Sequence, residues 1–352
     1  MKRALALFLF LVTCAGAAAL AGTSANATTR PPGHAAAISS GGPSGIGIRA
    51  GGPKVSSSAA LYARALKSGD WLRTPDGLEF HACVHQIPRG ATLDTIHNRI
   101  ILASGAVRSF TPCRYPRLVR PGQVRTPAGP QTEPAVAPTT HGWMQASWWN
   151  APTWLTSLSV RYAMPTPPAV SGATDYLFSS FENAARNSII QPVIGYGPTG
   201  ASGRPSAGGI GGNFMWMDSY YVWGANNVAA GFLYRENPGD TIAGSMTARS
   251  CNSAGGECTW AIKTTDTNNG NVSSISVVSS PSYVIAQGGV LESDGAAGCN
   301  MLFANHHGVF RNIAVSTHSG PATPSFQHKV FDQECSMSMN ISATGADILW
   351  TP

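Results

Sequence analysis

Short stretches of alternating apolar and polar residues, separated by turn-forming residues, fill the chain beyond residue 142. These stretches cover residues 143–149, 155–165, 173–183, 188–197, 212–224, 228–235, 241–250, 258–266, 272–279, 282–293, 301–317, 326–332 and 336–342. The turns between them are rich in Gly, Asn and Pro, as in 236–241 (ENPGDT) and 267–271 (TNNGN). Many short strands at regular spacing predict an all-β fold, a two-sheet antiparallel β-sandwich of the concanavalin-like type.

The first part of the chain has a different pattern. Residues 1–27 combine Lys2 and Arg3, an apolar stretch too short to span a membrane, and an A-x-A cleavage signal, so they predict a signal peptide and a secreted protein. Residues 28–60 are rich in Gly, Ser, Ala and Pro and are expected to be disordered. Residues 61–120 predict a small α+β unit, with a short helix ending at Gly69 followed by three strands.

Residues 121–140 contain five prolines and almost no large apolar side chains, which indicates a linker. We therefore expect three parts: a signal peptide at 1–27, a segment at 28–137 that combines disorder, the small unit and the linker, and a β-sandwich at 138–352. No further run is long enough to cross a membrane, so we expect a soluble extracellular protein.

The cysteines agree with export to an oxidising compartment. Cys14 lies within the predicted signal peptide, and the remaining six cysteines are an even number. Nearest-neighbour pairing fits the segment boundaries and predicts the disulfides Cys83–Cys113, Cys251–Cys258 and Cys299–Cys335. The alternative of a zinc site is disfavoured because the sequence has no C-x2-C pair.

The charges differ between the two halves of the mature chain. Only 11% of the residues are charged, about half the usual share. Residues 28–137 hold 13 Lys and Arg against 5 Asp and Glu, a net charge of +8, whereas residues 138–352 hold 8 against 12, a net charge of −4. The basic residues are not interleaved with aromatics as in proteins that bind single strands, so we expect no nucleic-acid partner. The charge difference suggests pairing between the halves of one chain, with chance and solubility as the alternative explanation, and we expect a monomer.

The usual catalytic signatures are absent from the sequence. It contains no G-x-S-x-G, no H-E-x-x-H and no phosphate-binding glycine loop before a helix, so we expect no cofactor and no metal. His81 and His85 are four apart on a predicted strand, about 13 Å from each other, and are expected to pack rather than to bind metal. The acids at 236, 240, 257 and 266 fall in turns and are expected to be solvated.

Two polar residues follow apolar strand runs and are the candidates for chemistry. Gln191 interrupts the run Ser188-Ile-Ile-Gln-Pro-Val, and Glu292 ends the run Tyr283-Val-Ile-Ala-Gln-Gly-Gly-Val-Leu-Glu. A glutamate at the end of an apolar strand is partly desolvated, which raises its pKa and suits a general base. Glu182 is the next acid to consider if Glu292 points to the wrong side of its sheet.

These two stretches resemble the glutamic peptidases of the eqolisin and neprosin type. NSIIQPVIGYG (187–197) is similar to the eqolisin strand with an I-L-Q core and to the T-I-E-A-G strand of neprosin. SYVIAQGGVLES (282–293) is similar to the W-G-G-E-V and A-E-W-I-V-E strands of the two families, and the NPGD turn precedes a central strand in eqolisins. Where neprosin has Glu after Gly-Gly, this chain has Val290, and its glutamate follows two residues later on the same face.

The resemblance implies a secreted, acid-acting endopeptidase made as a zymogen. Glu292 would activate a water, Gln191 would stabilise the oxyanion, and the two side chains would lie within about 7 Å of each other on either side of one bridging water. The substrate would be a peptide or protein, in a cleft lined by aromatic side chains from one strand: Trp216, Tyr220, Tyr221 and Trp223. The charges of the two halves further suggest that the basic segment before residue 138 is an inhibitory prosegment, which docks on the acidic half and is released by acid as the carboxylates lose their charge.

Two other functions fit the same pattern. A sandwich with an aromatic face also suits a carbohydrate-binding module without chemistry, and an inactive structural relative secreted in bulk is a third alternative. A prosegment is useful to a protease and of little use to a lectin, which favours the peptidase.

Overall fold

The structure is a computed structural model that describes residues 64–351, apart from 66, 76, 116, 119–123, 126–141, 200–212, 225, 253–255, 281, 297 and 333–334. The predicted signal peptide and the segment 28–60 lie outside the described residues, as does the predicted linker apart from β8 (Val124–Arg125). No described helix is both long and apolar enough to cross a membrane.

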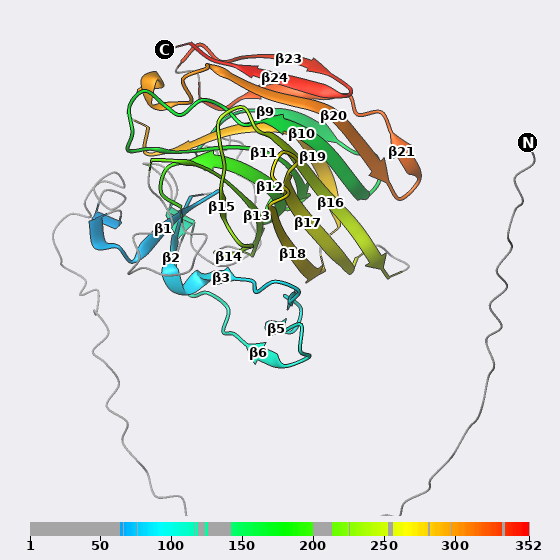
Figure 1. The fold of residues 1–352 in the computed structure, drawn as a ribbon. Coiled ribbons are helices and arrows are strands. Elements are labelled where there is room, and N and C mark those ends of the chain that lie inside the picture. The colour runs from blue at the N-terminus through cyan, green and yellow to red at the C-terminus, as the bar shows by residue number, and fades with distance from the viewer. Residues whose placement is uncertain are drawn as a thin grey trace, which may run out of the picture. The chain divides into compact units, whose positions relative to one another are not determined.

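Two large, mainly antiparallel sheets form the body of the protein, which confirms the predicted all-β sandwich (Figure 1). The first sheet has the order β22 (Gln327–Val330), β9 (Trp143–Asn150), β19 (Tyr283–Asp294), β11 (Thr174–Asn183), β12 (Ser188–Tyr196), β13 (Met215–Trp223), β14 (Asn227–Ala230) and β3 (Val84–Gln86), and β15 (Tyr234–Arg235) pairs with β13.

The second sheet has the order β23 (Ser338–Ser342), β24 (Gly345–Leu349), β20 (His307–Thr317), β10 (Leu155–Ala163), β16 (Thr241–Cys251), β17 (Cys258–Asp266), β18 (Val272–Ser279), β4 (Thr92–Asp94), β5 (Arg99–Ile101) and β6 (Val107–Ser109), and β21 (Gly320–Ala322) pairs with β20. A small sheet has the order β1 (Trp71–Thr74), β2 (Gly77–Phe80), β7 (Arg117–Leu118) and β8. Two 3₁₀ turns are described, η1 (His81–Cys83) and η3 (Cys299–Met301).

Alternation along the strands divides the apolar side chains of the first sheet between its two faces. The inner face packs against the second sheet and forms the main core, which includes Ile190 and Ile194 of β12 and Ile262 of β17. The opposite face, called the outer face below, carries a second buried cluster that includes Ile189 and Val193 of the same strand. Both faces of β12 are therefore buried, unlike the polar outer face that an antiparallel sheet commonly presents to water.

Strands from before residue 138 belong to the sandwich itself. β3 pairs in parallel with β14 at the edge of the first sheet, and β4 pairs in parallel with β18 in the second. Ile87 and Leu93 from this stretch lie in the main core, and Leu72 and Val84 lie in the outer-face cluster. The expected division at 137/138 into a separate small unit and a sandwich thus differs from the structure, in which segments from both sides of this position share the sheets.

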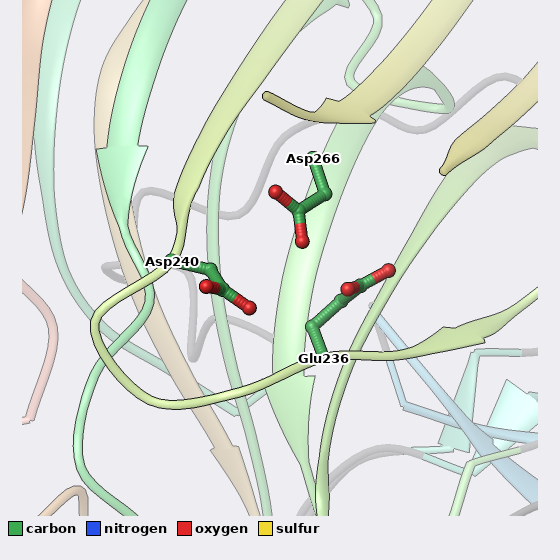
Figure 2. A group of neighbouring side chains, drawn as sticks. All are labelled: Glu236, Asp240 and Asp266. Atoms are coloured by element: carbon green, nitrogen blue, oxygen red, sulfur yellow. The ribbon is translucent and has the colours of Figure 1, made fainter. Parts of the chain in front are cut away.

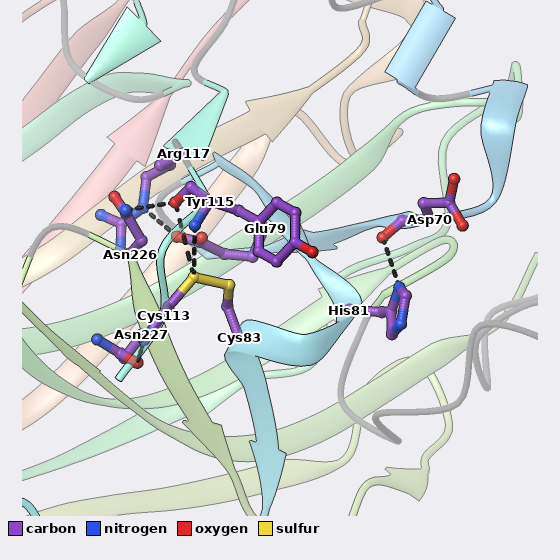
Figure 3. The surroundings of a disulfide bond; sticks show 9 residues. All are labelled: Asp70, Glu79, His81, Cys83, Cys113, Tyr115, Arg117, Asn226 and Asn227. Atoms are coloured by element: carbon purple, nitrogen blue, oxygen red, sulfur yellow. Dashed lines mark hydrogen bonds and ion pairs between the residues drawn. A yellow bond between two sulfur atoms is a disulfide. The ribbon is translucent and has the colours of Figure 1, made fainter. Parts of the chain in front are cut away.

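The three predicted disulfides are confirmed, with Cα–Cα distances of 5.1 Å for Cys83–Cys113, 4.0 Å for Cys251–Cys258 and 5.4 Å for Cys299–Cys335. The first ties η1 to a stretch that runs alongside β14 (Figure 3). There the backbone N–H of Cys113 donates to Oδ1 of Asn227 over 3.0 Å, and the side chain of Asn226 donates to the carbonyl of Tyr115. The disulfide therefore cross-links the N-terminal segment within itself, and these hydrogen bonds attach the cross-linked stretch to the end of the first sheet.

Candidate active site

Gln191 lies on the outer face of the first sheet and is completely buried. Its neighbour Pro192 points the opposite way, because a Cβ on Gly244 of the second sheet would come within 2.8 Å of the Pro192 ring. Within the described part of the chain, neither Oε1 nor Nε2 of Gln191 has a hydrogen-bond partner. Burying an amide without partners costs roughly 2–7 kcal/mol relative to water, so this residue is retained at the expense of stability.

A row of polar side chains crosses the outer face at the level of Gln191. Phe178 pairs with Val193 and Phe181 with Ile190, so Ser180 of β11 lies opposite Gln191. Ser180 in turn pairs with Gln287 of β19. Directly opposed residues of neighbouring strands point to the same face, which places Gln191, Ser180 and Gln287 side by side.

Hydrogen bonds connect this row to a carboxylate. The Ser180 hydroxyl donates to Oε1 of Gln287 over 2.7 Å, which fixes the orientation of that amide. The Nε2 of Gln287 then donates to Oε2 of Glu182 over 3.2 Å. Glu182 is 7% exposed, and Nε of Arg186 lies 3.5 Å from its Oε1.

Glu182 and Gln191 are diagonal neighbours on the outer face. Glu182 pairs with Ile189, two residues before Gln191 on β12. Side chains in this relation have Cβ atoms about 7–8 Å apart or somewhat less, within reach of each other for long side chains. One bound molecule can therefore contact both the carboxylate and the amide.

Glu292 lies on the same face but at a different level. It pairs with Tyr176, and Tyr176 pairs with Gly195, four residues beyond Gln191 on β12. Four residues correspond to about 13 Å along a strand, and two strand spacings add about 10 Å across the sheet. The structure therefore does not bring Glu292 beside Gln191, and the expected approach within about 7 Å is not found.

The four aromatic residues proposed to line the site divide between the two faces. Trp216 and Tyr220 belong to the outer-face cluster, and Tyr220 pairs directly with Gln191. Tyr221 and Trp223 pack on the main core. Trp216 and Tyr220 have no exposed surface, so neither offers a ring to solvent.

Sequence reasoning missed Asp218, a second buried acid near Gln191. It pairs with Val193, and its Oδ1 accepts hydrogen bonds from the Ser273 hydroxyl over 2.6 Å and from the Ser219 backbone over 2.7 Å. Burial raises the pKa of Asp218 to about 7. Its place in the apolar run FMWMDSYY was the available signal, because an acid inside such a run is buried on one face or the other.

His85 fits the expectation of a packing role. Its ring lies 4.6 Å from that of Phe110 and 5.8 Å from that of Trp223, and burial lowers its pKa to about 4. His81 instead begins η1 and lies next to the Phe80 ring.

Comparison with known proteins gives a fold-level similarity only. No protein-family model and no curated protein matches the sequence. Among solved structures, scytalido-glutamic peptidase with a peptide-based transition state analog has 14% identity and a TM-score of 0.43 over 60% of this chain and 98% of that chain. SCP-B, a member of the eqolisin family of peptidases in a complex with the tripeptide Ala-Ile-His, has 15% identity and a TM-score of 0.42 over the same shares. At these values no inference about function rests on either similarity.

Proposed function

We propose that the protein is a secreted glutamic-type endopeptidase that hydrolyses peptide bonds at the outer face of its first sheet. The observation that carries the proposal is the fully buried Gln191, whose amide has no partner among the described residues and lies diagonally beside Glu182. An amide that is buried without satisfaction costs stability, and such strain gathers at functional sites.

The reaction follows from these two groups. The Glu182 carboxylate takes a proton from a water molecule, whose oxygen forms a bond to the carbonyl carbon of the substrate. The Nε2 of Gln191 donates a hydrogen bond to the carbonyl oxygen as it becomes an oxyanion. Protonated Glu182 then gives its proton to the amide nitrogen as the C–N bond breaks, which regenerates the carboxylate.

Ser180 and Gln287 act as positioning residues in this scheme. The Ser180 hydroxyl holds Oε1 of Gln287, so that Nε2 faces Glu182 and orients its carboxylate. Gln287 and Gln191 are amides and cannot take up the proton of a water molecule. Glu182 is the carboxylate that Gln287 contacts and that lies diagonal to Gln191, so the base is assigned to Glu182. The role first expected for Glu292 remains a prediction, although its register is less favourable than that of Glu182.

The chain as described is proposed to be a latent form. Gln191 has no exposed surface, and Leu72 and Val84 of the N-terminal segment belong to the cluster that covers its face. Substrate reaches Gln191 only after part of this cover moves. The zymogen and activity in the acid range are parts of the proposal that rest on this burial and on the sequence resemblance. Cleavage of the chain, and not acid alone, is proposed to free part of this cover without releasing the whole N-terminal segment.

The test measures digestion of a denatured, disulfide-free substrate protein across the acid range. The peptidase is assayed before and after its own chain has been cut between residues 126 and 141. We expect hydrolysis that survives chelators and inhibitors of serine and cysteine peptidases and that Gln191→Ala reduces on the order of 100-fold. Absence of hydrolysis at every pH, together with binding to a glycan array, would instead favour the carbohydrate-binding module.

A further inference from the structure

Three carboxylates meet at one end of the sandwich, away from the row that contains Gln191. Glu236 and Asp240 come from the turn between β15 and β16, and Asp266 comes from the end of β17. One oxygen from each lies within 4.8 Å of the others, and Figure 2 shows the three side chains converging. The group is called the acidic triad below.

The three carboxylates of the acidic triad were expected from the sequence to be solvated, but two of them are buried. Asp266 has no exposed surface and Glu236 is 3% exposed, whereas Asp240 is half-buried. None of the three forms an ion pair with a basic side chain among the described residues. Three like charges in a partly buried site repel one another unless one carboxylate takes up a proton or a cation lies between them.

An unsatisfied buried oxygen points into the triad. Oδ1 of Asp266 accepts the backbone N–H of Asn268 over 2.6 Å, but Oδ2 is buried and has no hydrogen-bond partner in the described structure. Figure 2 shows this carboxylate directed towards Glu236 and Asp240. A buried carboxylate oxygen without a donor calls for an ion, a water or the proton of a neighbouring carboxyl, and this oxygen faces two further carboxylates.

The neighbouring contacts hold the triad in place. The side-chain amides of Asn269 and Asn271 donate to Oε2 and Oε1 of Glu236 over 2.7 and 3.1 Å. The backbone and side chain of Asn237 donate to Oδ2 of Asp240. These bonds orient two of the carboxylates but supply no positive charge. Burial, and next a hydrogen bond with the Asp266 carboxyl, raise the pKa of Glu236 to about 7, so near neutral pH a cation at the triad competes with this proton.

We propose that the acidic triad binds one Ca²⁺ ion, which joins the β15–β16 turn to the β17–β18 hairpin. Calcium takes oxygen ligands at about 2.3–2.6 Å, so two oxygens bound to one ion are at most about 5 Å apart. The three triad oxygens all lie within 4.8 Å of one another and are therefore close enough to share one ion. Magnesium requires shorter and near-octahedral bonds, which carboxylates from two separate turns suit less well. Waters complete the coordination, as at calcium sites with few protein ligands.

The inference does not depend on the peptidase proposal, because the acidic triad is outside the polar row. Its ligands bridge two connections, so the ion is expected to stabilise that end of the sandwich. With three carboxylates, we expect a dissociation constant in the range of extracellular calcium modules, about 10⁻⁴–10⁻³ M.

The experiment is titration calorimetry of the EDTA-treated, dialysed full chain with CaCl₂ near neutral pH, together with thermal unfolding. We expect one ion per chain and a Tm higher by about 3 °C at about 10 mM Ca²⁺. Asp266→Asn and Asp240→Asn should each abolish the heat of binding and the Tm increase. Asp240 is the more exposed of the two, so its variant is expected to fold even if the Asp266 variant does not.

Glu257→Gln, which alters an exposed turn carboxylate outside the triad, is the matched control and should bind Ca²⁺ like the parent. Absence of binding by the parent chain would overturn the proposal, and so would binding that Asp240→Asn leaves unchanged. Equal affinity for Mg²⁺ would overturn the assignment to calcium.

Discussion

At the scale of single residues, Gln191 and Gln287 are two buried amides on the strands either side of β11, and they differ in what they contact. Gln287 uses both ends of its amide, towards Ser180 and Glu182, whereas Gln191 uses neither within the described residues. The same substitution should therefore have opposite effects on stability at the two positions.

We predict that Gln191→Leu raises the free energy of unfolding by about 1 kcal/mol, because it replaces an unsatisfied buried amide by an apolar side chain. Gln287→Leu is the matched variant and should lower it by about 1–3 kcal/mol, since it leaves the hydroxyl of Ser180 and the carboxylate of Glu182 with one partner fewer. Urea denaturation of both variants measures the difference. A loss of stability in Gln191→Leu equal to that in Gln287→Leu would show that Gln191 is an ordinary satisfied core residue.

The buried acids predict how stability depends on pH. Burial raises the pKa of Asp175 to about 8 and that of Asp218 to about 7. A carboxyl with a raised pKa keeps its proton in the folded state where the unfolded chain has lost it, so stability falls as pH rises from about 4 towards the folded value. His85, with a pKa lowered to about 4, contributes the opposite slope, but only between about 4 and 6.5.

We therefore predict that Tm falls as pH rises from about 6.5 to 8, and that Asp175→Asn reduces this fall. Asn at this position keeps a group of similar size beside the Ser293 hydroxyl, which donates to Oδ1 of Asp175 over 2.6 Å. Thermal unfolding at several pH values checks the prediction. A Tm of the parent chain that is constant or rising over this window would contradict it.

At the scale of elements, the strands beyond residue 142 were largely predictable from the sequence. Alternation and turn residues predict strands at 258–266 and 272–279, and the structure has β17 at Cys258–Asp266 and β18 at Val272–Ser279. These strands are joined by a short turn and pair locally, so each carries its own signal.

The register between distant strands was not predictable in the same way. A bulge lies in β19 at Gln287–Gly289, where a Cβ on Gly289 would come within 2.7 Å of the Phe310 ring. Two consecutive glycines, Gly288 and Gly289, are typical of such a bulge, but they do not indicate which side chain of β19 it brings level with Gln191. The parallel pairing of β3 and β4 with strands more than a hundred residues away has no local signal either, and it was missed.

Because β4 supplies core, we predict that Leu93→Ala destabilises the whole sandwich by about 2–5 kcal/mol. Leu93 has no exposed surface and lies in the main core with residues of both sheets. Val107→Ala is the control in the same segment. Val107 is 55% exposed, so this variant should leave the free energy of unfolding nearly unchanged. If Leu93→Ala does not change the free energy of unfolding of the sandwich, the side chains of the N-terminal segment do not contribute to its core.

At the scale of the whole molecule, attachment of the N-terminal segment depends on more than opposite net charge. Its backbone pairs with both sheets, its apolar side chains enter both clusters, and Nη1 of Arg73 donates to the carbonyl of Gly172 over 2.9 Å. Acid removes carboxylate charge but weakens neither strand pairing nor apolar burial. Release by acid alone, which the charges of the two halves suggested, is therefore not expected.

We predict that a chain cut between residues 126 and 141 stays together as two fragments at about pH 3 and about 1 M salt, where charge attraction is screened. No disulfide joins the fragments, because Cys83–Cys113 lies before the cut and the other two lie after it. Size-exclusion chromatography should give one species, and denaturing electrophoresis without reductant should give two. Separate peaks in acid would restore the charge-driven release.

Glu182, diagonal to Gln191, is proposed to be the base of a peptidase. The most direct measurement compares kcat/KM for a quenched peptide substrate among the cut parent protein, Glu182→Gln and Glu292→Gln, each with a native unfolding profile. We predict that Glu182→Gln loses activity by about 10²–10⁴-fold, the usual contribution of a general base. Glu292→Gln should stay within about tenfold of the parent. Full activity in Glu182→Gln together with its loss in Glu292→Gln would contradict the assignment and place the chemistry at Glu292, at the C-terminal end of β19.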